Sequence, residues 1–140
     1  MFLRYAKGVD TCDWELVRSC FHPDARIEWG DFFAGDLDEG LSYLQHTLPN
    51  LEGTLHSFAT PSIELDLERG VATCETRAVN AARYAPDAEG VSIQNVSGTL
   101  YLDRFERRGG EWRLTFRRNE RQWVQNTREA PEPPPPASER

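Results

Sequence analysis

The 140-residue sequence has few of the residues that mark metal-binding, disulfide-bonded or membrane proteins. Its three histidines and three cysteines show no metal-ligand spacing. Because the cysteine count is odd, we expect Cys12, Cys20 and Cys74 to be reduced thiols. No apolar run approaches the roughly 20 residues of a membrane span, and the N-terminus lacks the apolar core of a signal peptide. These absences predict a cytoplasmic protein with no membrane partner.

Positive charge and nucleotide-binding motifs are also scarce. The formal net charge of −7 argues against a nucleic-acid partner, because such binding needs Lys and Arg to neutralise phosphates. There is no glycine-rich phosphate loop, and no serine or cysteine has the context of a catalytic nucleophile. Arginines gather at Arg117, Arg118 and Arg121, and we expect the first two on a solvated strand face. The sequence therefore favours a site without metal or cofactor.

Apolar residues are sufficient for one domain, since 39% of the chain is hydrophobic and it includes four Trp, seven Phe and four Tyr. We expect this domain to span residues 1–126. The following stretch, TREAPEPPPPASER, cannot bury a core, so residues 127–140 are predicted to be a disordered, proline-rich tail. A partner that recognises proline is an alternative role for this tail.

Apolar spacing predicts three helices before the strands begin. The first covers residues 1–9, the second starts at an Asp13 cap and stops before Pro23, and the third covers about 38–48. Four leucines of the third helix recur at helical spacing and should face inward. They are Leu37, Leu41, Leu44 and Leu48.

Alternating residues predict strands in most of the remaining chain. The expected extended segments are residues 25–29, 55–67, 71–84, 92–107 and 111–123, with a Gly109–Gly110 hairpin turn before the last. One face of residues 71–84 carries small side chains, which would leave room for a cavity. Because helices come first and strands follow, the fold class is α+β, with helices packed on an antiparallel sheet.

Two polar residues stand out as candidates for chemistry. Asp10 lies on an otherwise apolar path, and the separate cap at Asp13 leaves it free of capping. His56 lies in the segment TLHSF. An aspartate that accepts from one imidazole nitrogen makes the other nitrogen a better base, so this pair could move protons. From the residues alone, a purely structural Asp–His hydrogen bond stays open as an alternative.

The order of short motifs resembles the SnoaL-like branch of the nuclear transport factor 2-like superfamily. These motifs are YAKGVD, DWEL, HPDA, TLHSF and GTLYLDRFERRGGEW, and the resemblance covers about residues 2–124. It implies a cone in which a strongly curved antiparallel sheet packs on three N-terminal helices, with a pocket at the open end. Members include scytalone dehydratase, bile acid 7α-dehydratase and hexachlorocyclohexane dehydrochlorinase.

The resemblance also implies roles for individual residues. Asp10 and His56 match the aspartate and catalytic histidine of these enzymes, and Tyr5 matches a site tyrosine. Trp29 falls where a substrate-orienting tyrosine occurs, and Arg121 matches a pocket arginine. Other family positions differ, since a second histidine, a pocket asparagine and a second carboxylate are replaced. The residues at those places are Ala81, Tyr101 and Asn80.

The predicted function is a lyase or isomerase of dehydratase type that acts without a cofactor on a hydrophobic, cyclic, carbonyl-bearing small molecule. His56 would be the acid–base group, oriented by Asp10 and assisted by Tyr5. Substrate contacts would come from Trp29, Asn80, Tyr101 and Arg121. Asp103 is expected to pair with an arginine, and His22 and His46 to lie at the surface. The alternative is a binding or assembly module without catalysis; in either case a homodimer or homotrimer is expected.

Overall fold

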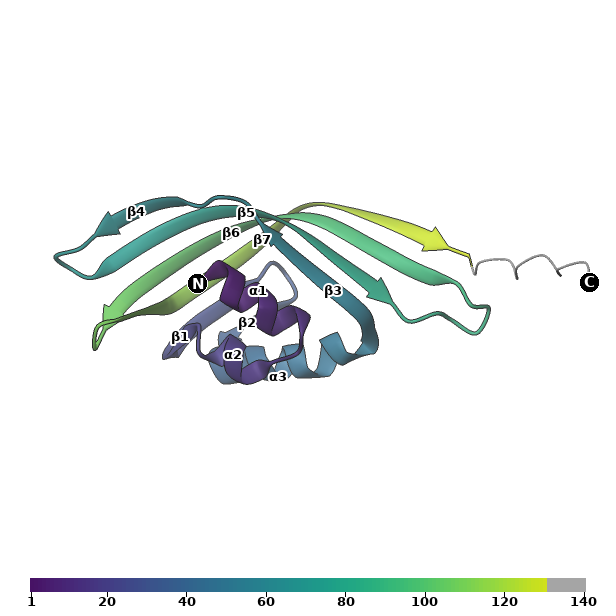
Figure 1. Cartoon of the computed structure of the whole chain (residues 1–140), viewed down its shortest axis with the longest axis horizontal. Helices are drawn as coiled ribbons and strands as arrows, with labels where there is room; N and C mark the ends of the chain where they lie inside the picture. Colours follow the sequence, from purple (N-terminus) through teal and green to yellow (C-terminus); the bar gives the residue numbers. More distant parts are fainter. Residues whose placement is uncertain (131–140) are drawn as a thin grey trace, which may run out of the picture.

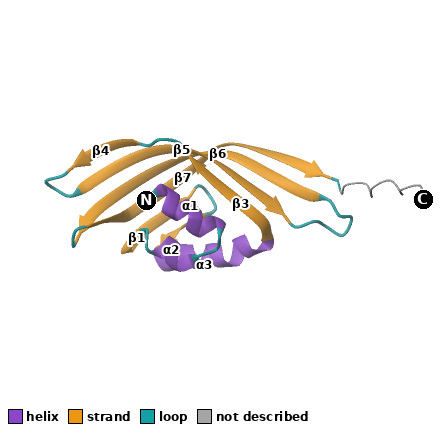
Figure 2. Ribbon diagram, in the orientation of Figure 1, coloured by secondary structure: helices purple, strands orange, loops and turns teal. Residues whose placement is uncertain are grey.

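The computed structural model describes residues 1–130 and places three helices on one side of a strongly curved sheet (Figure 1). Figure 2 shows these two layers, with the strands extending well beyond the helices. The α+β cone predicted from the sequence is confirmed. The elements are α1 (Phe2–Asp10), α2 (Trp14–Arg18), β1 (Phe21–Trp29), β2 (Phe33–Asp36), α3 (Leu37–Thr47), the 3-10 helix η1 (Leu48–Asn50), β3 (Leu51–Phe58), β4 (Ser62–Asp66), β5 (Val71–Tyr84), β6 (Ser92–Arg108) and β7 (Glu111–Glu129).

The seven-stranded sheet has the order β2-β1-β7-β6-β5-β3, and β4 pairs along another part of β5. Neighbouring strands are antiparallel except for β1 and β7, which run parallel with Ile27 opposite Arg117. The expectation of a wholly antiparallel sheet is therefore wrong at this one pair. A parallel pair needs a long crossover connection, and here the connection contains α3, η1 and the strands β2 to β6.

The second helix is shorter than its apolar pattern predicts. It ends at Arg18, and β1 already begins at Phe21, so that Pro23 lies inside a strand. Proline cannot donate a ladder hydrogen bond, but the pairing of β1 with β7 is irregular between Phe21 and Arg26. This irregularity accommodates Pro23 without breaking the sheet.

Side-chain caps fix where α2 and α3 begin. As predicted, Asp13 caps α2, and its carboxylate accepts from the Leu16 backbone N–H at 3.0 Å. Asp36 and Glu39 form a reciprocal capping box at the start of α3. The leucine stripe of α3 faces inward as expected, with Leu37 and Leu41 buried.

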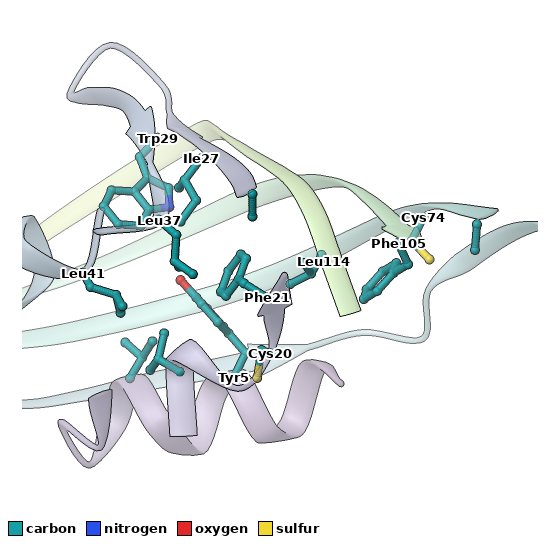
Figure 3. Close-up of a cluster of buried hydrophobic side chains, with 14 residues drawn as sticks. Tyr5, Cys20, Phe21, Ile27, Trp29, Leu37, Leu41, Cys74, Phe105 and Leu114 are labelled. Atoms are coloured by element: carbon teal, nitrogen blue, oxygen red, sulfur yellow. The ribbon is translucent and has the colours of Figure 1, made fainter. Parts of the chain in front are cut away.

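The hydrophobic core lies between the helices and the concave face of the sheet. Figure 3 shows Tyr5 projecting from α1 toward Phe21, with Phe105 and Leu114 contributed by the sheet. All three cysteines are free thiols, as expected. Two aromatic residues are largely exposed, since Phe32 keeps 59% and Trp123 keeps 51% of its accessible surface.

Arg117 contradicts its predicted place on a solvated face, because its side chain is 0% exposed. Its guanidinium donates to both carboxylate oxygens of Asp103, at 2.8 and 2.7 Å, and this confirms the arginine partner predicted for Asp103. The Asp103 carboxylate raises the pKa of Arg117 against the opposing effect of burial, so the guanidinium stays charged. Arg118, the next residue, is exposed as predicted.

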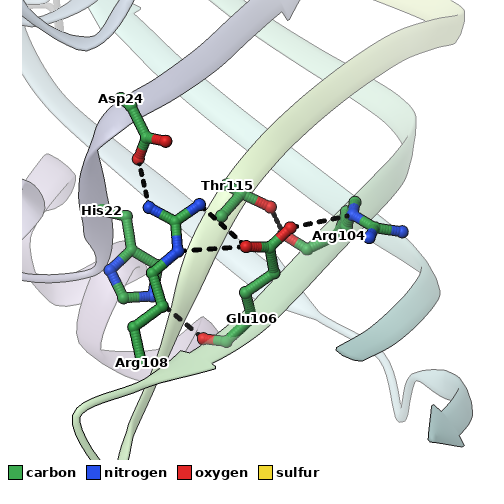
Figure 4. A network of polar contacts seen from close by, with 6 residues as sticks. All are labelled: His22, Asp24, Arg104, Glu106, Arg108 and Thr115. Carbon is green, nitrogen blue, oxygen red and sulfur yellow. Dashed lines mark hydrogen bonds and ion pairs between the residues drawn. The ribbon is translucent and has the colours of Figure 1, made fainter. Parts of the chain in front are cut away.

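His22 was also expected at the surface but is buried, and its Nε2 lies 2.9 Å from the backbone oxygen of Glu106. Figure 4 shows it beside a polar network in which Arg108 binds Asp24 and Glu106. The contact between His22 and Glu106 joins β1 to β6, which lie on either side of β7, near one end of the sheet. His46 is exposed as predicted.

The last strand, β7, continues past the expected domain end at Asn126 as far as Glu129. Most of the predicted tail, residues 131–140, lies outside the described residues. Among residues 1–130, no helix is long and apolar enough to cross a membrane. Cytoplasmic location stays a prediction.

Candidate active site

Asp10 is the last residue of α1, and the chain turns sharply just after it. Cys12 has a positive φ of 53°, and the Asp13 backbone N–H donates to Gly8 O at 2.8 Å. The helix therefore includes Asp10, one residue beyond the predicted end at residue 9, and the break follows it. A carboxylate at this position faces the negative end of the helix dipole, so it needs partners to be stabilised.

These partners come from β3. Asp10 Oδ1 lies 2.7 Å from His56 Nδ1 and accepts from the Thr54 hydroxyl at 2.9 Å, while Oδ2 accepts from the His56 backbone N–H at 2.9 Å. Burial is the largest single influence on the Asp10 pKa and raises it. The hydrogen bonds from His56 and Thr54 together outweigh burial, so the Asp10 pKa is lowered and the carboxylate is ionised.

His56 is held so that one ring nitrogen is occupied and the other is free. Its side chain is 15% exposed and lines a cavity of about 530 Å³ under the concave sheet. Within residues 1–130, the only side-chain partner of its ring is Asp10, at Nδ1, and Nε2 has no protein partner. The carboxylate therefore favours the tautomer with the proton on Nδ1, which leaves Nε2 able to accept a proton.

Helix α1, helix α3 with its 3-10 extension η1, and the concave face of the sheet form the cavity walls (Figure 1). Ten of its eighteen lining residues are apolar or aromatic, and the other eight are polar. The lining residues are Tyr5, Val9, Trp29, Phe32, Tyr43, Leu44, Thr47, Leu48, Asn50, Leu51, His56, Asn80, Tyr84, Ser97, Thr99, Tyr101, Asn119 and Arg121. Six of the seven predicted site residues are in this set, and the seventh, Asp10, lies behind His56.

Tyr5 lies beside His56, with ring centroids 6.5 Å apart in an edge-on arrangement. The Arg117 guanidinium carbon lies 4.2 Å from the centroid of the Tyr5 ring. Burial raises the pKa of the Tyr5 phenol far above its usual value, although Arg117 acts in the opposite direction. Tyr5 is therefore a protonated phenol that can donate a hydrogen bond.

Asn80 pairs with His56 across β3 and β5, and its side chain lies on the cavity wall. The Asn80 Nδ2 group donates to Tyr101 Oη at 3.1 Å and to Thr99 Oγ1 at 3.2 Å. Burial raises the pKa of Tyr101, so its phenol also keeps its proton. The phenol oxygen accepts from Asn80, and Asn119 is a second hydrogen-bonding neighbour of this phenol.

The mouth of the cavity is aromatic. Trp29 packs against Phe33 and Tyr43 with ring centroids 5.0 and 5.5 Å apart. Arg121 is exposed, and its guanidinium carbon lies 4.8 Å from the centroid of the Phe32 ring. The mouth therefore combines flat apolar surfaces with one cation.

Sequence reasoning missed several lining residues, and the polar residue Asn119 is one of them. It lies two positions before Arg121 on β7, so strand alternation could have placed both side chains on one face. Tyr43 gave no such signal, because it lies off the leucine stripe of α3. No cluster of His, Cys, Asp or Glu suited to a metal ion occurs among residues 1–130.

A family model described as a SnoaL-like domain matches residues 1–118. No curated protein matches the chain by sequence. A scytalone dehydratase-like structure from Novosphingobium aromaticivorans DSM 12444 is 17% identical, covers 97% of this chain and 89% of its own, and has a TM-score of 0.76. Hexachlorocyclohexane dehydrochlorinase LinA-type3 from Novosphingobium barchaimii LL02 is 16% identical, covers 96% of this chain and 90% of its own, and has a TM-score of 0.76. The Kfla4162 protein from Kribbella flavida is 16% identical, covers 89% of this chain and 87% of its own, and also has a TM-score of 0.76. At these identities, the likeness shows a shared fold.

Proposed function

This chain belongs to the SnoaL-like domain family, and on that premise we propose that it is a lyase or isomerase of dehydratase type that works without a cofactor. Its substrate is a hydrophobic, cyclic small molecule with a carbonyl group. His56 is the acid–base group, Asp10 orients it, and Tyr5 assists. The fold is shared with a scytalone dehydratase-like protein and with a dehydrochlorinase, both named for elimination reactions.

One observation carries the proposal. The imidazole of His56 lines the cavity with Nε2 unbonded by any described residue, while Asp10 Oδ1 lies 2.7 Å from Nδ1. A histidine with a purely structural role would satisfy both ring nitrogens with protein groups or remain exposed. Here one nitrogen is oriented by a carboxylate and the other faces space of ligand size.

The reaction that suits this geometry is elimination of water from a β-hydroxy carbonyl compound. Nε2 of neutral His56 takes the proton from the carbon next to the carbonyl, and the C–H electron pair forms an enolate. The enolate then expels the β-hydroxyl group, which takes the proton back from the imidazolium and leaves as water. A carbon–carbon double bond remains, and one group has served as base and then as acid.

Two phenols are placed to stabilise the enolate oxygen. Tyr5 and Tyr101 line the same cavity as His56, and their burial raises both phenol pKa values. A neutral phenol gives a hydrogen bond to developing negative charge, as in an oxyanion hole. Asn80 holds the Tyr101 oxygen, and Trp29 provides a flat wall for the ring of the substrate.

The test is turnover of bicyclic β-hydroxy ketones, followed by the ultraviolet absorbance of the conjugated product. We expect His56→Ala to lose the activity, by a factor of about 10²–10⁴ or more for a missing acid–base group. His46→Ala is the matched control and should retain the wild-type rate, since His46 is exposed on α3. A folded His56→Ala protein with the wild-type rate would contradict the mechanism.

A second candidate is a binding module without catalysis. It is favoured by the additional bonds of Asp10, which accepts from Thr54 and from the His56 backbone and so ties α1 to β3. In that case His56→Ala would change only ligand affinity and stability, and the protein would turn over none of the bicyclic β-hydroxy ketones.

A further inference from the structure

The charge around the cavity differs from that of the whole chain. The protein has 23 Asp and Glu against 16 Lys and Arg. Yet among the described residues that line the cavity there is no Asp or Glu, and Arg121 is the one Lys or Arg. Two carboxylates lie close behind the lining: Asp10 accepts from His56 and Thr54, and Asp103 is paired with Arg117. An anion can therefore enter the cavity without meeting an unpaired negative group.

Arg121 is positioned to bind such an anion. Its guanidinium carbon lies 4.8 Å from the centre of the Phe32 ring, a cation–π contact, and among residues 1–130 its N–H groups make no hydrogen bond to another side chain. Of the five arginines of β7, Arg113, Arg117 and Arg118 form ion pairs within residues 1–130, whereas Arg121 and Arg128 take part in none of the ion pairs there. Of these two, Arg121 is the one that lines the cavity, and its guanidinium suits the two oxygens of a carboxylate.

A second donor lies beside Arg121 on the same strand. Asn119 lines the cavity opposite Tyr101, between Arg121 and the deeper part of the pocket. Its side chain already has a hydrogen-bonding contact with the Tyr101 phenol, and since an amide carries two N–H groups, one can still donate to an oxygen that Arg121 also contacts. The two side chains together make a polar strip on β7 that is separate from His56 on β3.

The distance between this strip and His56 sets the size of the ligand. The order β7-β6-β5-β3 places three inter-strand steps between them, or about 14 Å at the backbone. The side chains of Arg121 and His56 and the curvature of the sheet shorten this gap. The cavity of about 530 Å³ that contains both groups has room for a ligand larger than a single ring.

From these observations we infer that the substrate is a carboxylate-bearing, fused-ring compound, with its carboxylate on Arg121 and Asn119 and its reactive ring carbon at His56. This inference rests on the proposed function, because it uses the same cavity, and it adds charge and size to the substrate class. Recognition of the carboxylate is an equilibrium property, so it can be measured without turnover.

The experiment compares binding of 2-naphthoate with that of its neutral isostere 2-naphthamide, by isothermal titration calorimetry at low ionic strength. We expect the wild-type protein to bind the acid about tenfold or more tightly than the amide, as for a charge-assisted hydrogen bond. Arg121→Gln should reduce this preference to about onefold and leave the affinity for the amide unchanged. Added salt should weaken binding of the acid alone.

Two variants separate this inference from the catalytic proposal. Arg118→Gln removes the same charge from the same strand at an exposed residue paired with Glu28, and should keep the preference for the acid. His56→Gln should also keep it, whether or not His56 is catalytic. Equal binding of acid and amide by the wild type, failure of the acid to bind, or a preference that survives Arg121→Gln would each overturn the inference.

Discussion

At the scale of single residues, Asp10 carries a negative charge that the dipole of its own helix destabilises. It ends α1, where the helix dipole is negative, and it stays ionised because His56 and Thr54 donate to it. These hydrogen bonds stabilise the folded state only while the carboxylate is charged. The stability of the protein should therefore depend on pH through this residue.

The sign of this dependence follows from the lowered pKa of Asp10. Above its ordinary value of 3.8, Asp10 is ionised in both states and its full contribution is present. As the pH falls below that value, the unfolded chain binds the proton first, and the contribution is lost as the pH falls through the folded pKa. We expect the free energy of unfolding to fall more between about pH 6 and about pH 3 in the wild type than in Asp10→Asn.

Urea unfolding at a series of pH values measures this difference. Asp24→Asn is the control, because Asp24 has a lowered pKa through its bond to Arg108 but lies on the surface, where solvent screens the pair. Its removal should change the slope less than removal of Asp10. Parallel profiles for the wild type and Asp10→Asn would contradict the role of Asp10 in stability.

At the scale of elements, the buried pair Arg117–Asp103 joins β7 to β6 at directly opposite positions. One guanidinium nitrogen, Nη1, is buried without a described partner, and aromatic rings enclose the group. Removing one member of a buried pair leaves the other charge uncompensated. Removing both can cost little, because apolar side chains avoid the desolvation penalty.

We therefore expect Arg117→Met alone to lower the free energy of unfolding by about 3–5 kcal/mol. The double variant Arg117→Met with Asp103→Leu should recover most of this loss. Arg118→Met at an exposed site should change stability by no more than about 0.5 kcal/mol. Urea unfolding of the four proteins measures these differences. A double variant as unstable as Arg117→Met alone would show that an uncompensated Asp103 charge is not the cause of the loss.

The elements also show what the sequence could and could not reveal. The alternation of residues 71–84 is unbroken, and β5 has those same bounds. The start of β1 was missed because Pro23 resembles a helix stop, and nothing nearby indicates that β7 will tolerate an irregular pairing there. The burial of Arg117 was missed because it belongs to a group of arginines with Arg118 and Arg121, while its partner Asp103 lies on another strand.

The candidate site follows the same pattern. Asp10 and His56 are far apart in the sequence, so local spacing alone could not pair them, and the family resemblance was needed. The cavity walls were partly predictable, because the small-residue face of β5 and the alternation of Thr99, Tyr101 and Asp103 mark the concave side. Asn119 and Tyr43 depended on curvature and helix placement, which only the folded chain defines.

At the scale of the whole molecule, the outer face of the sheet is unusually apolar. Leu55, Val79 and Trp123 are exposed there, and a hollow of about 440 Å³ includes Val79, Gly98 and Trp123. Such a patch on a charged protein is typical of an interface. It agrees with the expectation of a homodimer or homotrimer that associates through this face, which stays a prediction.

If that expectation is right, Trp123→Lys should convert the oligomer to a monomer, because it places a charge in the centre of the apolar patch. Light scattering after size-exclusion chromatography gives the mass directly. Leu3→Lys is the matched control, since Leu3 is exposed on α1 on the helical side of the sheet. A wild-type protein that is monomeric at micromolar concentration would end this hypothesis.

The parallel pairing of β1 with β7 bears on how the protein is made. Ile27 pairs with Arg117, and the Leu114 backbone N–H donates to Cys20 O at 2.9 Å. The first strand therefore cannot complete its pairing until the last strand has been synthesised. During synthesis, the helices and β1 leave the ribosome long before β7 exists, and their apolar surfaces stay uncovered until then. The cavity closes in the same step, because Asp10 comes from the start of the chain and Arg121 from its final strand. Nascent chains that stop short of β7 have neither a complete core nor a pocket, and they are natural clients for chaperones.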